Sequence, residues 1–253
     1  MRSLGGYHPA KLAGYEAIRK RLYADQPAGR LASWLGARLV VLDGRLRPDQ
    51  LPLLTELGCE VEPEPLAAGD VVAYRNREAL PRARLVDRWQ PAPAGGAQAL
   101  GAFLDGIQAG QVDVAGTVRL DRAPDPAPVA AAGGALPAPE FVDDGLDQVV
   151  LRTAAATPAV LVLADMNAPG WSARLDGKPV PLLTADLVLR AVAVPAGPHT
   201  VEFRYSDPSV RAGLTVSVIG AILTLGLVAL SFVPRLRWRA TVASRAKGPG
   251  ADE

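Results

Sequence analysis

The residues of this chain that could carry chemistry are few, and most of them are aspartates. Asp143, Asp144 and Asp147 lie close together in the sequence and could supply oxygen ligands to a calcium ion. Asp165 and Asp186 could act as a paired acid and base if the fold brought their carboxyl groups together. Each group also has a structural interpretation, because aspartate is common where a strand begins and in turns.

The other reactive residue types are scarce. The two histidines, His8 and His199, lie far apart, and Cys59 is the single cysteine, which we interpret as a core residue. His199 is expected to support the turn before the last strand. The sequence has no phosphate-binding glycine loop, no nucleophile elbow and no zinc-ligand spacing. It therefore predicts no catalytic residue, no metal site and no cofactor in this chain.

Two aromatic residues and two arginines could instead bind a ligand. Trp171 and Tyr205 could stack on sugar rings, although an aromatic anchor between two sheets is the alternative. Arg82 and Arg84 alternate with apolar residues after Pro81, as on a half-exposed strand. We expect these arginines to be solvated, and contact with a lipid-linked phosphate is the alternative.

Composition narrows the classes of function. The chain has 253 residues and is 49% hydrophobic, enough to bury the core of one or two domains. Its 27 Lys and Arg nearly balance its 26 Asp and Glu, for a formal charge of +1. Such a charge creates no long-range field for nucleic acid, so we expect no nucleic-acid partner.

Residues 212–234 predict a transmembrane helix. This segment carries no charge between Arg211 and Arg235 and is long enough to cross the hydrocarbon core of a bilayer, about 30 Å. The lipid bilayer is therefore an expected partner. Small residues on this segment would also let a neighbouring helix approach closely, so we expect upstream membrane helices of the same or a companion chain as partners, packed near Gly213, Gly220 and Gly226.

The charges that flank this segment predict its orientation. Basic residues crowd the tail, residues 235–253, which places the tail in the cytoplasm and residues 1–207 outside. Residues 1–30 contain no apolar stretch that could export such a domain. Either the chain is a fragment of a longer membrane protein, or the predicted orientation is wrong.

Hydrophobic periodicity predicts an α+β fold. Helical and strand patterns alternate in residues 1–90, as in small α/β units, and residues 91–140 hold one helix and a linker rich in Pro, Ala and Gly. Strand patterns dominate residues 141–207, with Asp176-Gly177 as a strong two-residue hairpin turn. The third region should form an antiparallel β-sandwich.

Several segments together resemble one family, the YfhO-type bacterial membrane proteins. Early segments of the resemblance are Gly6-Tyr7-His8-Pro9, 35–41 and Tyr74-Arg75-Asn76 followed by 79–83. The late block runs from 169 to 205 and ends in Phe203-Arg204-Tyr205 before the last membrane helix. Its residues that we expect to form a structural motif are Gly170, Trp171, Asp176, Gly177, Arg190, Gly197, His199 and Tyr205.

The resemblance implies the last extracytoplasmic domain and closing membrane helix of a polytopic glycosyltransferase of the GT-C class at a bacterial cell membrane. Such a protein would move sugar from a polyprenyl-phosphate carrier onto an envelope polymer, and its catalytic part would lie upstream of this chain. Envelope glycan or lipid-linked sugar is then a further possible partner. The chain departs from the family at His8, where an acidic residue is usual, and at 165–168, where aromatic residues are common.

Three functional hypotheses follow. The first is an accessory domain of that transferase, without chemistry of its own. The second is a membrane-anchored carbohydrate-binding, polymer-binding or structural module that uses Trp171. The third is an enzyme with a site assembled from Asp143, Asp165 or Asp186.

Overall fold

The computed structural model describes residues 13–22, 29–43, 59–65, 71–129, 136–207 and 213–230. His8, the middle of the predicted linker and the basic tail lie outside the described residues. The chain divides into two compact units, Met1–Ser206 and Asp207–Glu253.

Three helices form one layer of the first unit. They are α1 (Ala13–Leu22), α2 (Gly29–Trp34) and α4 (Gly96–Gln108). Apolar residues recur at helical spacing on α4, and they form its buried face: Ala99, Leu100, Phe103, Leu104 and Ile107. A small antiparallel sheet accompanies these helices in the order β1-β3-β2, with β1 (Leu39–Asp43), β2 (Cys59–Pro65) and β3 (Val71–Asn76).

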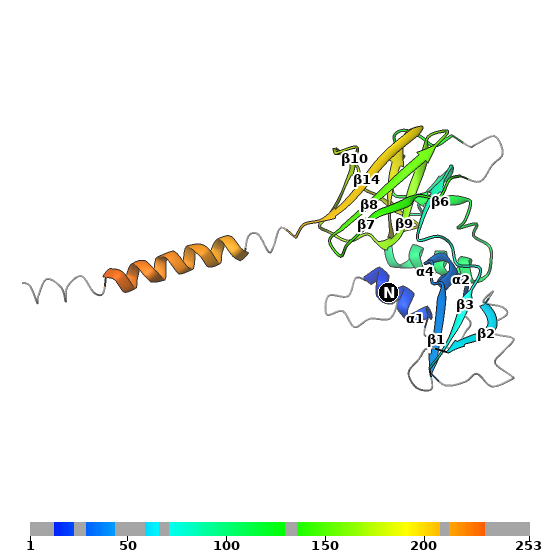
Figure 1. Cartoon of the computed structure of the whole chain (residues 1–253), viewed down its shortest axis with the longest axis horizontal. Coiled ribbons are helices and arrows are strands. Elements are labelled where there is room, and N and C mark those ends of the chain that lie inside the picture. The colour runs from blue at the N-terminus through cyan, green and yellow to red at the C-terminus, as the bar shows by residue number, and fades with distance from the viewer. Residues whose placement is uncertain are drawn as a thin grey trace, which may run out of the picture. The chain divides into compact units, whose positions relative to one another are not determined.

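The other two layers are β-sheets (Figure 1). The six-stranded sheet has the order β4-β9-β13-β12-β6-β5, with β4 (Ala83–Val86), β5 (Arg88–Pro91), β6 (Thr117–Leu120), β9 (Ala159–Met166), β12 (Leu183–Ala185) and β13 (Leu189–Val194). The five-stranded sheet has the order β11-β10-β14-β8-β7, with β7 (Glu140–Asp144), β8 (Gln148–Ala155), β10 (Trp171–Leu175), β11 (Lys178–Val180) and β14 (Gly197–Tyr205). Strands β5 and β6 pair in parallel, and the other paired strands of both sheets are antiparallel.

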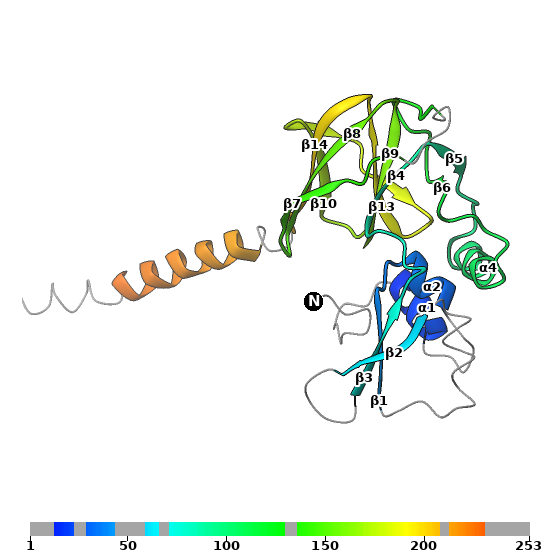
Figure 2. The ribbon, with the colours of Figure 1, turned by 45° about the vertical axis from the view of Figure 1, so that its right-hand side comes forward.

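The six-stranded sheet lies between the helices and the second sheet, as Figure 2 shows. One buried cluster, which includes Trp34, Phe103 and Val162, fills the space against the helices. Another, which includes Leu161 and Phe203, fills the space between the two sheets. Strand β13 is buried on both faces, which explains its unbroken apolar run apart from Arg190. The prediction of an α+β fold with a sandwich-like part is confirmed.

The sandwich also contains strands from outside residues 141–207, the region predicted to form it. Strand β4 pairs with β9, and β6 pairs with β12. Residues 83–120 thus supply three strands to the six-stranded sheet. This pairing also corrects the expectation of solvated arginines after Pro81, because Arg84 is buried on β4.

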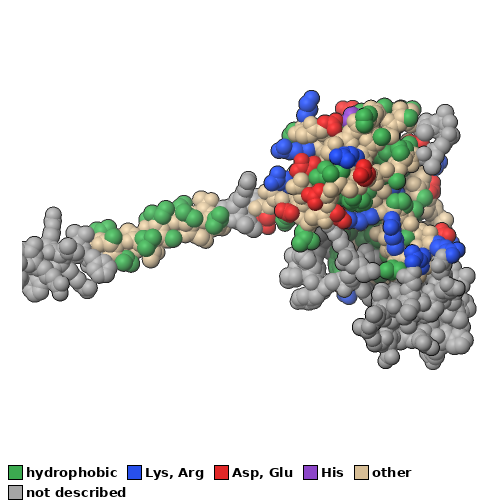
Figure 3. Space-filling model, in the orientation of Figure 1, with side chains coloured by type: hydrophobic (Ala, Val, Ile, Leu, Met, Phe, Trp, Pro, Cys, Tyr) green, Lys and Arg blue, Asp and Glu red, His purple; other side chains and the backbone are tan. Residues whose placement is uncertain are grey.

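The second unit contains one described helix, Gly213–Leu230. Its 18 residues have a mean hydropathy of 2.3, and at 1.5 Å per residue the helix spans about 27 Å. The large apolar side chains along this helix are exposed, and Figure 3 shows them without charged neighbours on the visible face. This helix is long and apolar enough to cross a membrane.

Candidate functional site

Asp165 is the centre of a cluster of charged and aromatic residues at one end of the sandwich. It lies on β9, beside Arg190 on the paired strand β13, and Arg82 immediately precedes β4 on the other side of β9. The pairing register of β9 and β13 shifts between Leu189 and Arg190. Three neighbouring strands therefore bring one carboxylate and two guanidinium groups together.

The carboxylate of Asp165 is held by both arginines. Arg82 donates from Nε to Oδ1 at 2.9 Å and from Nη2 to Oδ2 at 2.7 Å, a two-pronged arrangement that suits a guanidinium. Arg190 donates from Nη2 to Oδ2 at 2.8 Å. The side chains of Asp165 and Arg190 are 14% and 4% exposed, so these ion pairs are only weakly screened by water.

Arg82 also connects the two sheets. Its Nη1 donates to both carboxylate oxygens of Asp144 on β7, at 2.9 and 2.8 Å. Burial lowers the pKa of the Arg82 guanidinium, but hydrogen bonds and the charges of Asp165 and Asp144 outweigh burial and raise it. Arg82 is therefore a fixed positive charge that joins β7 of one sheet to β9 of the other.

Trp171 covers the Arg190 side of the cluster. The guanidinium carbon of Arg190 lies 3.7 Å from the centre of the Trp171 ring, and Phe203 lies nearby at 5.7 Å. Trp171 also contacts the ring of Tyr205, with the two centroids 5.5 Å apart. One face of Trp171 is thus occupied by an arginine, while Tyr205 is 38% exposed. Sugar stacking on either residue stays a prediction.

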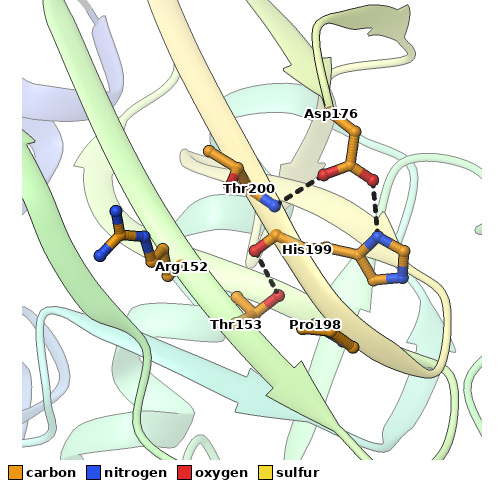
Figure 4. A pocket seen from close by; sticks show the side chains of 6 residues that line it. All are labelled: Arg152, Thr153, Asp176, Pro198, His199 and Thr200. Atoms are coloured by element: carbon orange, nitrogen blue, oxygen red, sulfur yellow. Dashed lines mark hydrogen bonds and ion pairs between the residues drawn. The ribbon is translucent and has the colours of Figure 1, made fainter.

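The Asp176-Gly177 turn is fastened to the last strand. Both residues have positive φ, 50° and 77°, as a two-residue turn between β10 and β11 requires. Asp176 Oδ1 accepts a hydrogen bond from the backbone N–H of Thr200 at 2.8 Å, and Oδ2 lies 2.7 Å from Nδ1 of His199 (Figure 4). The hydrogen bond from Thr200 is the main cause that lowers the pKa of Asp176, followed by the bond to His199.

A shallow pocket of about 250 Å³ lies over this turn. Arg152 and Thr153 of β8 line one side, and Asp176, Pro198, His199 and Thr200 complete it. Gly197, with φ of 110°, begins β14 just before these residues. His199 therefore lies in the turn region before the last strand, with Nε2 3.3 Å from the carbonyl oxygen of Ala196.

Asp186 belongs to a different, fully buried cluster. Its carboxylate accepts hydrogen bonds from Nε1 of Trp34 at 3.2 Å and from the backbone N–H of Arg119 at 3.0 Å, and Arg84 lies 3.6 Å away. Burial raises the pKa of Asp186 more than these contacts lower it. Asp165 and Asp186 are thus bound by separate sets of partners, and no contact joins the two described carboxyl groups as the acid and base hypothesis expected.

The sequence did not indicate Trp34, Arg84 or Arg119 as partners of this carboxylate. Arg84 Nε and Nη1 and Arg119 Nη1 are buried without a hydrogen-bond partner among the residues that the structure describes. The available signal for this cluster was that Trp34, Arg84 and Arg119 stand among apolar residues. Their contacts, however, join segments as many as 152 residues apart.

The calcium hypothesis finds no support in the part of the chain that the structure describes. Within that part, no group of three or more His, Cys, Asp or Glu residues could hold a metal ion. Asp144 is bound by Arg82 instead, and the carbonyl oxygen of Asp147 accepts the N–H of Tyr205 at 2.7 Å.

The described carboxylates therefore act as acceptors that tie strands together. Asp165 and Asp144 join the sheets through Arg82, Asp176 fixes a hairpin, and Asp186 fixes the helix layer to the six-stranded sheet. No protein-family model, curated protein or solved structure matches the chain.

Proposed function

We propose that this chain is the extracytoplasmic accessory domain and terminal membrane helix of a YfhO-like membrane protein that glycosylates an envelope polymer from a polyprenyl-phosphate-linked sugar. The observation that carries the proposal is the cluster around Asp165. The late-block residues Trp171 and Arg190 contact each other there, and both contact residues that hold the two sheets together. These contacts support a structural role for the late-block residues.

The C-terminal helix supports the membrane part of the proposal. Strand β14 ends at Tyr205, and the apolar helix begins at Gly213, so the folded domain is tethered close to a bilayer in which the helix is inserted. Basic residues in 235–253 favour a cytoplasmic tail and an outer domain. In this arrangement the domain would shape the acceptor side, while membrane segments outside this chain would carry the transfer chemistry.

Cysteine labelling in intact cells tests the orientation. In a Cys59→Ser background, Lys178→Cys on the exposed β11 and Ala251→Cys in the tail are expressed in the full chain. A membrane-impermeant maleimide is expected to label residue 178 in intact cells and residue 251 only after lysis. The reverse pattern would rule out the extracytoplasmic assignment.

The glycosylation part is tested in the source organism. Deletion of the gene segment that encodes residues 13–207 is expected to reduce the sugar content of an envelope polymer, measured by compositional analysis. Complementation with the wild-type segment should restore the sugar, and a segment with Arg190→Met should restore less. An unchanged sugar content in the deletion strain would contradict the proposal.

A membrane-anchored carbohydrate-binding module is the alternative, and the exposure of Tyr205 favours it. Tyr205 presents 38% of its surface next to Trp171. Binding of envelope glycan to the full chain in detergent, measured by calorimetry, should fall on Tyr205→Ala and persist in Arg174→Ala, a change at an exposed residue of β10. Binding that Tyr205→Ala leaves unchanged would exclude this site.

A further inference from the structure

The end of the sandwich from which the chain leads to the C-terminal helix carries exposed apolar side chains. Leu146, in the turn between β7 and β8, is 91% exposed, and Val142 on β7 is 47% exposed. Tyr205 lies beside this turn, because its N–H donates to the carbonyl oxygen of Asp147 at 2.7 Å. We call Val142, Leu146 and Tyr205 the turn surface.

Leu146 is almost fully exposed at the tip of a hairpin, so it is available to a partner that would remove it from water. The turn between β7 and β8 is otherwise polar, with Asp143, Asp144 and Asp147 around Leu146. An exposed apolar side chain with a polar rim is a feature of surfaces that contact other proteins or membranes.

The length of the tether limits what can cover this surface. Ser206 is bound at this same end, since its N–H donates to the carbonyl oxygen of Gly170 at 2.8 Å. Gly213, where the helix begins, is seven residues further on, a span of at most about 25 Å when fully extended. With the helix in a bilayer, the tether keeps Ser206 within about 25 Å of the residue at which that helix begins.

The aromatic residues at this end fit the same partner. Trp171 and Tyr205 lie in contact, and Trp and Tyr are enriched where proteins meet the boundary between lipid and water. The negative charge around Leu146 indicates which lipid headgroups this surface could contact. Asp143 and Asp147 are exposed beside Leu146, so they would be repelled by anionic headgroups and attracted by the ammonium group of a zwitterionic one.

We propose that the turn surface docks on the headgroup layer of the bilayer, with Leu146 inserted among zwitterionic lipids of the ethanolamine type. Docking would restrict the orientation of the sandwich above the membrane. This inference goes beyond the proposed function, since it requires only that the C-terminal helix is inserted in a bilayer.

Fluorescence quenching in vesicles tests this docking. The full chain in a Cys59→Ser background carries one bimane-labelled cysteine, at Leu146→Cys, at Lys178→Cys on β11, or at Ala221→Cys within the C-terminal helix. Each is reconstituted into phosphatidylethanolamine and phosphatidylcholine vesicles with doxyl lipid labelled near the headgroup. All three positions are exposed, so the labels should not disturb the fold. Near-UV circular dichroism checks that each labelled chain is folded.

The proposal expects blue-shifted emission and strong quenching at residue 146, and water-like emission with weak quenching at residue 178. Replacing part of the lipid with phosphatidylglycerol should reduce quenching at residue 146. Two results together would overturn docking: water-like emission of the label at residue 146, and quenching of the label at residue 221 by doxyl groups deeper in the bilayer. They would leave the proposed function intact. Residue 221 unquenched at every depth would instead contradict membrane insertion and with it the proposed function.

A second copy of the chain is the competing occupant of the turn surface. Oxidation of the unlabelled Leu146→Cys variant in vesicles distinguishes lipid from a second copy as the occupant. If the turn surface docks on lipid, no disulfide-linked dimer should form. Efficient dimer formation that persists on dilution with lipid would overturn the proposal.

Discussion

The guanidinium of Arg190 lies between the Trp171 ring, 3.7 Å away, and the carboxylate of Asp165, 2.8 Å away. Trp171 begins β10 of the five-stranded sheet, whereas Asp165 and Arg190 belong to the six-stranded sheet. One side chain therefore joins the two sheets by a charged contact and an aromatic one. This arrangement explains why a charged residue is tolerated in the buried strand β13.

Arg190→Met should destabilise the domain. The change removes one of two ion pairs to a buried carboxylate and the stacking on Trp171, and we expect a loss of about 3 kcal/mol, the lower end for a broken buried pair, because Arg82 still holds Asp165. Arg190→Lys keeps the charge but loses the planar stacking on Trp171. Its unfolding free energy should lie between those of the wild type and Arg190→Met. Urea unfolding of the detergent-solubilised chain, followed by near-UV circular dichroism, measures both.

Arg174→Met is the matched control for this change. Arg174 is an exposed residue of β10, and its replacement should alter the unfolding free energy by less than about 0.5 kcal/mol. Equal stability of the Arg190→Met and Arg174→Met chains would show that the cluster around Asp165 does not hold the sheets together.

Asp186→Asn tests the second buried cluster. The change turns one carboxylate oxygen into an NH2 group that must face an N–H donor, either Nε1 of Trp34 or the backbone of Arg119, and we expect a loss of about 1–3 kcal/mol. The double variant Arg84→Met/Asp186→Asn should recover part of this loss. Additive effects in this double-mutant cycle, measured by urea unfolding, would mean that the two side chains do not interact.

The same variant should change the pH dependence of stability. Because burial raises the pKa of Asp186 above its ordinary value of 3.8, the folded state favours the protonated acid. The wild-type chain therefore gains stability relative to Asp186→Asn as the pH falls through the raised pKa towards 3.8. Unfolding free energies at pH 7, 5 and 4 measure this difference, and a constant difference would contradict the raised pKa.

Local chemistry made part of this structure predictable. Asp176-Gly177 indicated a hairpin because few other residue pairs accept two successive positive φ angles, and the turn lies where it was expected. The buried face of α4 followed from helical spacing in the same way. Such features depend on residues that are neighbours in the sequence.

The charged clusters could not be predicted in this way. From the sequence alone, Arg84 is expected to be solvated, because burying a guanidinium is costly unless a partner is present. Its partner Asp186 lies 102 residues further on, and Trp34 lies 152 residues before Asp186. The strand order β4-β9-β13-β12-β6 and the packing of α2 on this sheet bring them together, and no periodicity in a single sequence encodes that order.

Asp176→Asn should weaken the fastening of the hairpin to β14 in a pH-dependent way. The hydrogen bond from Thr200, followed by that from His199, lowers the pKa of Asp176 below its ordinary value of 3.8. Its contribution to stability is therefore present above pH 3.8 and is lost as the pH falls through the lowered pKa. The wild type should exceed Asp176→Asn in stability at pH 6, and the gap should close in strong acid.

Acid titration of the unfolding midpoint measures that gap. Asp143→Asn, at an exposed residue of β7, is the control for removal of one surface carboxylate. A gap between the wild type and Asp176→Asn that persists unchanged in strong acid would show that the carboxylate charge is not what fastens the turn.

Gly170→Ala and Gly177→Ala form a matched pair of turn variants. Both glycines have positive φ, 96° and 77°, so alanine at either position should cost about 1 kcal/mol. A methyl group at Gly177 would meet no atom within 4 Å, whereas one at Gly170 would lie 2.8 Å from Cε2 of Tyr205. Gly170→Ala should therefore lose about 1–3 kcal/mol more, because Tyr205 must move.

Thermal unfolding and tyrosine fluorescence together distinguish the two variants. Gly170→Ala should lower the melting temperature more than Gly177→Ala, and it should also change the emission of Tyr205, because the contact of its ring with Trp171 is disturbed. Since the N–H of Ser206 donates a hydrogen bond to the carbonyl oxygen of Gly170 at 2.8 Å, this variant should also loosen the end of β14 that leads to the C-terminal helix. Equal melting temperatures for the two variants would show that Tyr205 does not pack against Gly170 in solution.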